Sequence, residues 1–450
     1  MAGTSGSENI STKQRRIAEL AKSMPGAALT TLAHHMDVAW LRAAHQGTRR
    51  DGALGVDGQS AEQYAENLEA NLQALLNRAK DGSYRAPPVR RVEIPKGDGS
   101  TRPLGIPTYE DKILQRAVKM LLEPVYETEF KPYSYGFRPG RSAHQALESF
   151  WQQAMDMGGC WVVEVDIRKF FDTLDHEHLR DILQRRIRDG VVLRLIGKWL
   201  HAGVMASGAL SYPDAGTPQG GVISPLLANI YLHTVLDEWF DTEVQPRLSG
   251  RSFLIRYADD FVMGFEEESD ARRVLAVLPQ RFGRFGLALH PDKTRLVRFH
   301  RPSGRDGDAD PGSFDLLGFT HYWGRSRKGA WVIKRKTSGQ RFTRALKAIR
   351  AWLAEHLHDP VRQQWEALKR KLQGHYGYYG ITGNADAIGR FRTEVGILWK
   401  RALGRRSQRG NLNVKGFAAI TARFPLPQAT VVHSVYSRPQ RTSSLKSRMR

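Results

Sequence analysis

The chain has 450 residues and one cysteine, Cys160, which excludes an intrachain disulfide and a multi-cysteine zinc site. No apolar run of about 18 residues is present, and the N-terminus lacks a signal-peptide core. We therefore expect a cytoplasmic, nucleoid-associated protein. Residues 321–450 hold 28 Lys+Arg against 5 Asp+Glu, whereas the first 320 hold 40 against 41. This basic second part predicts a polyanion partner, either nucleic acid or an anionic membrane surface.

The first half of the chain alternates between helical and strand-like patterns. Residues 1–25 are expected to be loosely ordered. Apolar spacing, strand-forming residues and turn residues predict the following elements: helices over 26–47, 61–80, 110–127, 177–201 and 221–240, a hairpin over 89–107 around KGDGS, and a buried strand over 160–167.

The stretch RYADDF lies between two strand-like runs, which predicts a hairpin over 252–265. Its adjacent carboxylates, Asp259 and Asp260, have a simple explanation, since Asp is a common turn residue. A helix near 268–286 and strands near 294–299 and 314–322 are expected next. Beyond about residue 335 the pattern is helical and basic, and the segment from 407 reads as either a flexible arm or a small basic module.

A further carboxylate, Asp166, ends the predicted buried strand, where an ionised group needs a cation or hydrogen-bond donors. A helix N-cap or a salt bridge to Arg168 or Lys169 would satisfy it. Alternatively, Asp166 faces Asp259 and Asp260. Three carboxylates suit a hard cation such as Mg²⁺, with Mn²⁺ as a substitute, and two such ions can clamp the oxygens of a phosphoryl transfer.

Several ordered blocks resemble reverse transcriptases. DIRKFFDTLDH, GTPQGGVISPLLANIYL, RYADDFVM, LHPDKT and DLLGF occur in the order and spacing of the palm motifs of that family. EIPKGDGSTRPLGIPT and YSYGFRPGRSAHQAL resemble the fingers of group II intron-encoded reverse transcriptases. LKRKLQGHYGYYGITGN and WKRALGRRSQRG resemble the maturase region of the same family.

The resemblance implies an α/β (α+β) right-hand polymerase fold, with fingers and an antiparallel palm sheet followed by a helical thumb/maturase domain. The expected domains are an N-terminal extension (1–60), fingers and palm (61–325), thumb/maturase (326–405) and a short basic DNA-binding segment or tail (406–450). It also implies the type that lacks a C-terminal endonuclease.

The resemblance also implies roles for individual residues. Asp166, Asp259 and Asp260 correspond to the metal-binding catalytic residues, and the backbone carbonyl of Ile167 helps to hold a metal. Lys293 corresponds to a lysine that protonates the pyrophosphate leaving group; a surface lysine is the alternative.

Four residues are expected to contact the incoming nucleotide. Phe171 matches a steric gate that excludes a 2′-OH, although a core phenylalanine is the simpler explanation. Gln219 matches a nucleotide contact, in a stretch that a Gly/Pro turn would also explain. Lys96 and Arg102 flank the fingers turn and are expected to meet the triphosphate, unless they are ordinary solvated charges.

Nucleic-acid contacts are expected in the second part of the chain. Leu317, Gly318 and Phe319 resemble the primer-grip turn. The aromatic-rich GHYGYYG suggests stacking by Tyr376 and Tyr378, whereas helix packing is the commoner use of such rings. The remaining expected contacts are with phosphates: Arg401, Arg405, Arg406 and Arg409.

The function that these expectations define is an RNA-directed DNA polymerase encoded by a group II intron, which also assists splicing and mobility. Its partners would be group II intron RNA, template RNA, primer DNA duplex and target DNA. The alternatives are an RNA-binding splicing cofactor with a vestigial polymerase site, a domesticated or defence-associated reverse transcriptase, and an RNA-dependent RNA polymerase. The bulky Phe171 argues against the last.

Overall fold

A computed structural model describes residues 4–95, 101–206, 209–212, 216, 220–302, 311–406 and 412–434. The chain divides into two compact units. The first contains residues 1–146 and 161–296, and the second contains residues 147–160 and 297–450. Within the described ranges, no helix is both long enough and apolar enough to cross a membrane.

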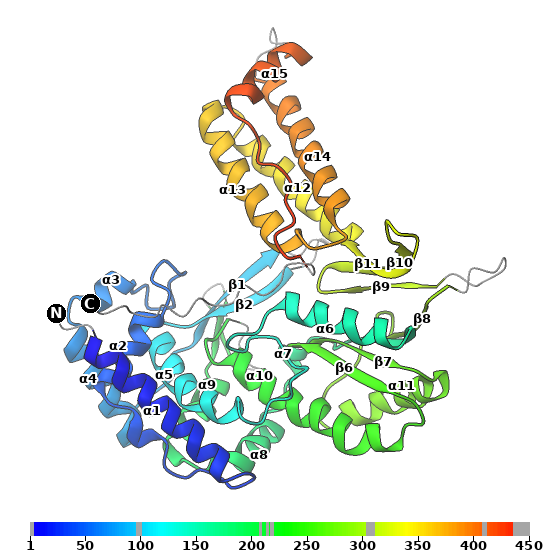
Figure 1. Ribbon diagram of the computed structural model, residues 1–450. Coiled ribbons are helices and arrows are strands. Elements are labelled where there is room, and N and C mark those ends of the chain that lie inside the picture. The colour runs from blue at the N-terminus through cyan, green and yellow to red at the C-terminus, as the bar shows by residue number, and fades with distance from the viewer. Residues whose placement is uncertain are drawn as a thin grey trace, which may run out of the picture. The chain divides into compact units, whose positions relative to one another are not determined.

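The first unit begins with a group of packed helices (Figure 1). α1 (Thr4–Ser23) and α2 (Val38–Gly47) both pack against α5 (Tyr109–Tyr126). The expectation that residues 1–25 are loosely ordered was wrong, since Ile17 and Ala21 of α1 are each only 1% exposed. The remaining helices of this region are η1 (Ala33–His35), α3 (Ala61–Ala65) and α4 (Leu68–Asp81).

The predicted hairpin near residue 100 is present. β1 (Val89–Pro95) and β2 (Thr101–Ile106) pair antiparallel, with Pro95 opposite Thr101. β4 (Val204–Ala206) and β5 (Ala209–Ser211) extend this sheet in the order β2-β1-β4-β5. β4 pairs with β1 in parallel, so this sheet is mixed.

Four predicted helices differ from the structure. The span 26–47 is helical only over Ala33–His35 and Val38–Gly47, because the helix α2 begins at its Asp37 cap, and the span 61–80 forms two helices, α3 and α4. The span 177–201 forms two helices, α8 (His176–Arg186) and α9 (Gly190–Leu200), because the Asp189 carboxylate caps the second by accepting from the N–H groups of Val191 and Val192. The span 221–240 begins later, as α10 (Ser224–Leu232), and continues as two π-helical turns, η2 (His233–Glu238) and η3 (Phe240–Val244), then η4 (Gln245–Arg247).

The central sheet of the first unit contains the predicted RYADDF hairpin. β6 (Ser252–Tyr257) and β7 (Asp260–Phe265) pair antiparallel, and β7 also pairs antiparallel with β3 (Gly159–Asp166). The sheet order is β6-β7-β3-β8, where β8 is Arg295–His300. α7 (Phe170–Thr173) follows β3, and α11 (Glu268–Gly283) follows β7 and contacts it.

The second unit contains a three-stranded antiparallel sheet in the order β11-β10-β9. Its strands are β9 (Ser313–Leu316), β10 (Phe319–Arg325) and β11 (Trp331–Thr337). The single strand predicted over 314–322 is therefore two strands joined by a turn. α6 (Ala143–Asp156) lies mostly in this unit, where Trp151 Nε1 donates to the Ile333 carbonyl at 3.0 Å.

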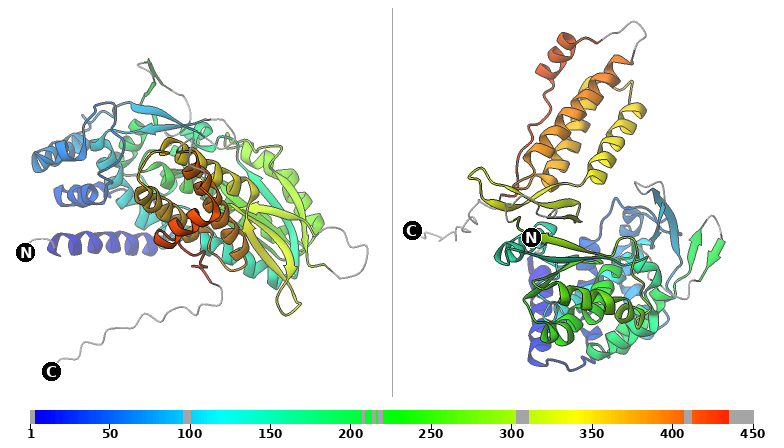
Figure 2. Two further views of the ribbon diagram at one scale, coloured as in Figure 1. Left: turned by 90° about the horizontal axis from the view of Figure 1, so that it is seen from above. Right: turned by 90° about the vertical axis from the view of Figure 1, so that its right-hand side faces the viewer.

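A helical bundle completes the second unit. α12 (Gly339–Glu355), α13 (Val361–Tyr379) and α14 (Ala385–Gly404) lie side by side in the views of Figures 1 and 2. Its core includes Leu368, Leu372 and Trp399, all fully buried. α15 (Val414–Arg423) follows, and residues 424–434 run back along the bundle to pair at Ile381 with His433. This part of the C-terminal region is thus packed rather than a free arm.

The fold is a mixture of helices and mainly antiparallel sheets followed by a helical bundle, as the sequence predicted at that level. The compact units divide the chain near residue 296, which is a structural division. The boundaries of the expected fingers, palm and thumb remain predictions.

Candidate active site

The three predicted catalytic carboxylates lie at one end of the central sheet. Asp166 is the last residue of β3 and stands opposite Asp260, the first residue of β7, in antiparallel register. Asp259 and Ala258 form the two-residue connection between β6 and β7. The β-branched and aromatic residues on both sides of the turn form the strands that bring these groups together.

The carboxylates affect one another electrostatically. Burial raises the pKa of Asp259, and the negative charge of Asp166 raises it further. The guanidinium of Arg102 acts in the opposite direction, which places Arg102 of β2 within electrostatic range of the carboxylates. This end of the sheet therefore concentrates negative charge that a cation would stabilise.

The donor chemistry of this cluster fits Mg²⁺, which prefers carboxylate and carbonyl oxygens and keeps several water ligands. Among the described residues, no group of three His, Cys, Asp or Glu side chains is arranged so that it could hold a metal ion. Asp166 Oδ2 accepts a hydrogen bond from Lys293 Nζ at 2.6 Å. Water and substrate oxygens would have to complete the coordination.

Backbone pairing explains why Lys293 reaches Asp166. The N–H of His290 donates to the Asp166 carbonyl at 2.8 Å, and Ile167 forms an antiparallel bridge with Leu289. Ile167 is 4% exposed, so its carbonyl belongs to a fixed part of the backbone. The predicted proton donor and the predicted metal ligands are thus neighbours.

The predicted nucleotide residues Lys96 and Gln219 lie outside the described residues. Phe171 in α7 is half-buried and packs edge-on against Phe170 with ring centroids 5.4 Å apart. A Cβ on Gly216 would lie 2.8 Å from the Phe171 carbonyl oxygen, and one on Gly220 would lie 2.6 Å from the Gly105 oxygen of β2. Gly216 therefore lies close against Phe171, and Gly220 lies close against β2.

The predicted primer-grip turn of the second unit has left-handed backbone at Leu317 (φ 51°) and Gly318 (φ 80°). Tyr378 Oη donates to the Leu317 carbonyl at 2.8 Å, and the rings of Tyr378 and Phe319 stack at 5.7 Å. Tyr376 is only 3% exposed, and its hydroxyl donates to the Pro427 carbonyl. A base cannot reach the Tyr376 ring in this arrangement, which favours packing over stacking for this residue.

Two of the predicted phosphate contacts line a groove between α12 and α14. The groove has a volume of about 220 Å³ and is lined by Arg350, Arg401 and Arg405 together with leucine and alanine side chains. Arg406 instead donates to the Asp359 carbonyl within the bundle. Arg409 lies outside the described residues.

Sequence reasoning missed Arg256, whose side chain is fully buried beneath the Asp259–Asp260 turn. It forms an ion pair with Asp237, which is also fully buried. The available signal was an arginine directly before YADD in a strand with apolar residues on both faces.

The comparisons with known proteins identify the class. Residues 94–321, about half of the chain, match the family described as reverse transcriptase (RNA-dependent DNA polymerase). The chain belongs to this family, and the expected enzyme class, RNA-directed DNA polymerase, is confirmed.

The chain is also similar to individual proteins. Protein YkfC of Escherichia coli K12 is 36% identical over 359 residues, which cover 71% of this chain and 90% of YkfC. The group II intron-encoded protein LtrA of Lactococcus lactis is 42% identical over 190 residues, 40% of this chain and 31% of LtrA. Nuclear intron maturase 2 of Arabidopsis thaliana is 27% identical over 236 residues, 44% of this chain and 30% of that protein.

These relatives confirm the resemblance to group II intron-encoded proteins. The aligned region spans less than a third of LtrA and of the plant maturase. What those complete proteins do is therefore taken up as a proposal for this chain.

Proposed function

We propose that this chain is the reverse transcriptase of a group II intron, that it copies intron RNA into DNA, and that it binds this RNA to assist splicing and mobility. The register that sets Asp166 opposite Asp260, with Asp259 next in the turn, is the observation that carries the proposal. In a right-hand description, the central sheet is the palm, β1 and β2 belong to the fingers, and the bundle of α12–α14 is the thumb.

Asp166, Asp259, Asp260 and the Ile167 carbonyl are the groups that would hold two Mg²⁺ ions. Such ions, when bound, supply charge stabilisation for the attacking and leaving oxygens of an in-line displacement. Arg102 binds the triphosphate of the incoming nucleotide, while the Phe171 ring excludes a 2′-OH. Lys293, which forms an ion pair with Asp166, donates a proton to the departing pyrophosphate.

Primer extension tests the catalytic assignment. Purified protein receives an RNA template, a DNA primer, deoxynucleotides and Mg²⁺, and the Asp259→Asn/Asp260→Asn variant is assayed beside it. Asp181→Asn is the control, since this exposed carboxylate lies in α8. We expect the wild type and control to extend the primer and the double variant to be inactive. RNA binding without any extension by the wild type would instead favour a splicing cofactor.

The Phe171 assignment has a matched control in its neighbour. Phe171→Ala should increase the incorporation of ribonucleotides relative to deoxynucleotides. Phe170 is 2% exposed, so Phe170→Ala should lower the stability of the fold without changing sugar selectivity. If the two variants changed sugar selectivity equally, the gate assignment would be wrong.

The groove of Arg350, Arg401 and Arg405 supports the RNA-binding part of the proposal. None of these guanidiniums has a hydrogen bond or ion pair with another described residue, and no acidic side chain lines the groove. Changing all three to Gln should weaken RNA binding and reduce the slope of log K against log salt by roughly 2. The corresponding triple Lys variant keeps the charge and should retain the slope. An unchanged slope in the Gln variant would contradict this assignment.

A further inference from the structure

The Asp259–Asp260 turn has a strained backbone. Ala258, the residue before Asp259, has φ 57°, a left-handed conformation that is unfavourable for a residue with a Cβ. Strained residues of this kind persist where the surrounding structure holds them in place.

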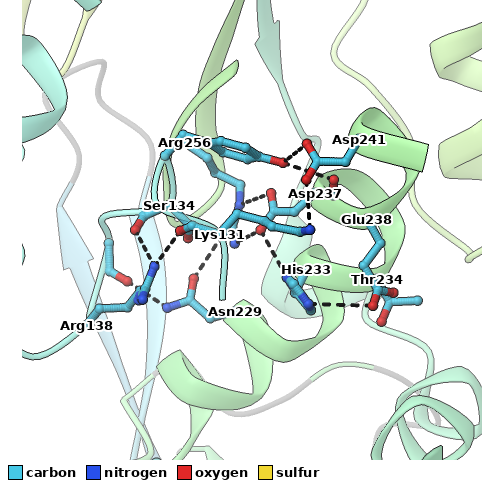
Figure 3. Close-up of polar contacts among 12 residues, drawn as sticks. Lys131, Ser134, Arg138, Asn229, His233, Thr234, Asp237, Glu238, Asp241 and Arg256 are labelled. Carbon is cyan, nitrogen blue, oxygen red and sulfur yellow. Dashed lines mark hydrogen bonds and ion pairs between the residues drawn. The ribbon is translucent and has the colours of Figure 1, made fainter. Parts of the chain in front are cut away.

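Arg256 contacts the turn from below. Its Nη1 donates to the Ala258 carbonyl at 3.1 Å and to Asn229 Oδ1 at 2.9 Å. The same guanidinium also donates two hydrogen bonds to Asp237. Nε donates to Oδ1 at 2.8 Å, and Nη2 donates to Oδ2 at 2.5 Å. Figure 3 shows Arg256 beside Asn229 and Asp237, which both belong to the helical segment that follows the TPQGG region.

The partner helix is itself irregular at this point. Asn229 belongs to α10, whereas Asp237 belongs to the π-helical turn η2. π-helical turns frequently occur at functional sites. Burial acts to raise the pKa of Asp237, but the charge of Arg256 and contacts with His233 outweigh it and hold the pKa below its usual value. The ionised form of the Asp237 carboxylate is thus stabilised beside Arg256.

A second contact fixes the opposite side of the turn. Asn229 Nδ2 donates to the Gly136 carbonyl at 2.6 Å. Gly136 lies so close to the turn that an added Cβ would be 2.2 Å from the Ala258 nitrogen. Arg256 and Gly136 therefore meet the same residue, one through its carbonyl and the other through its nitrogen, and Asn229 joins them.

We propose that Arg256, Asp237 and Asn229 are positioning residues that hold the strained Ala258 turn, and thereby the carboxylates of Asp259 and Asp260, in the geometry needed for nucleotidyl transfer. This inference rests on the proposed catalytic role of those carboxylates. A planar guanidinium is required because one group must reach Asp237, Asn229 and Ala258 together, which a lysine ammonium cannot do.

The test compares two buried arginines. Arg256→Lys keeps the charge next to Asp237 but loses the fork. Arg186→Lys is the control: Arg186 is 4% exposed and likewise donates to a carboxylate, Glu129, and to backbone carbonyls, among them Ala21 at 2.6 Å. It has no contact with the turn in the described structure. Asn229→Ala, which removes both of its contacts, serves as a second variant if Arg256→Lys does not fold.

Two measurements distinguish positioning from general stability. The first is single-turnover primer extension at saturating template–primer, and the second is amide hydrogen exchange at residues 257–261. We expect Arg256→Lys and Asn229→Ala to slow the chemical step by roughly 10- to 100-fold, to leave the KM for template–primer unchanged, and to speed exchange at the turn. Arg186→Lys should leave the rate and the exchange at the turn as in the wild type.

Two outcomes would overturn the inference. One is a folded Arg256→Lys or Asn229→Ala protein with wild-type rate and exchange. The other is an equal loss of rate in Arg186→Lys. A different result would reject the proposed function, namely primer extension by the Asp259→Asn/Asp260→Asn protein. An inactive double variant beside a fully active Arg256→Lys protein would reject only the positioning role.

Discussion

The substitution Gly136→Ala adds one methyl group next to the turn that carries the proposed catalytic residues Asp259 and Asp260. The new Cβ would lie 2.2 Å from the Ala258 nitrogen and 2.8 Å from the Tyr257 carbonyl carbon. Ordinary van der Waals contact begins at about 3.4 Å, so the two backbone segments must separate by about 1 Å.

The magnitude follows from which atoms can move. Both clashing partners are backbone atoms, and the Gly136 carbonyl is held by Asn229 at 2.6 Å. Overpacking of this kind costs about 1–3 kcal/mol of folding free energy. A displacement of catalytic groups by about 1 Å lowers rates by roughly 100-fold, which is the loss we expect in the rate of primer extension.

The assay is single-turnover primer extension, with urea unfolding to measure stability. Gly197→Ala is the control, since a Cβ at this position in α9 meets no atom within 4 Å. It should keep the wild-type rate and gain up to about 1 kcal/mol of stability, because Ala is a better helix former than Gly. A folded Gly136→Ala protein with the wild-type rate would refute the argument that close packing at Gly136 sets the position of the turn.

Three further changes test other parts of the structure. Burial raises the pKa of Asp111 to about 6, so the folded protein binds this proton more tightly than the unfolded chain does. The free energy of unfolding therefore falls by about 3 kcal/mol as pH rises from 3.8 through about 6. Urea unfolding should show this loss in the wild type and not in Asp111→Asn; parallel curves would contradict it. Leu372→Ala, in the bundle core, should cost about 2–5 kcal/mol of unfolding free energy. Gly220 has φ 114°, and Gly220→Ala places a Cβ 2.6 Å from the Gly105 oxygen. This variant should raise the KM for deoxynucleotides more than it lowers kcat. A loss in kcat alone would count against the prediction.

The sequence predicted the RYADDF hairpin because its signals are local. Apolar β-forming runs flank two turn-forming residues, and the strand ending at Asp166 is mostly apolar, with Glu164 as the exception. The register that sets Asp166 opposite Asp260 is not local. Carboxylate chemistry offered a meeting of these residues as one alternative, and the family resemblance favoured it.

Arg256 could not be assigned from local pattern. A charged residue in a strand usually indicates a solvent-facing position, but the four inner residues of β6 are all buried, so the sheet is covered on both faces. Its partner Asp237 lies in a π-helical turn, where the register of an ordinary helix no longer predicts which side chains face the sheet.

The errors in helix prediction have tertiary causes. α1 contains few apolar residues, yet Ile10, Ile17 and Ala21 are buried because α1 packs on α5. The span 177–201 breaks because Asp189 both caps α9 and accepts from the backbone N–H groups of Leu32 and Ala33. The packing of α1 on α5 and the contacts of Asp189 with Leu32 and Ala33 both involve residues far away in the sequence, so neither can be read from the segment itself.

The charge distribution and the candidate site complement each other. A cluster of three carboxylates repels the phosphates on which it would act, and bound cations would relieve this repulsion only locally. The first 320 residues are almost neutral and so offer little general attraction to nucleic acid. Residues 321–450 carry the excess positive charge, including the arginine-lined groove. We therefore assign affinity for the polyanion to one part of the chain and the proposed chemistry to another. This division allows the carboxylate turn to be acidic without weakening the binding of its substrate.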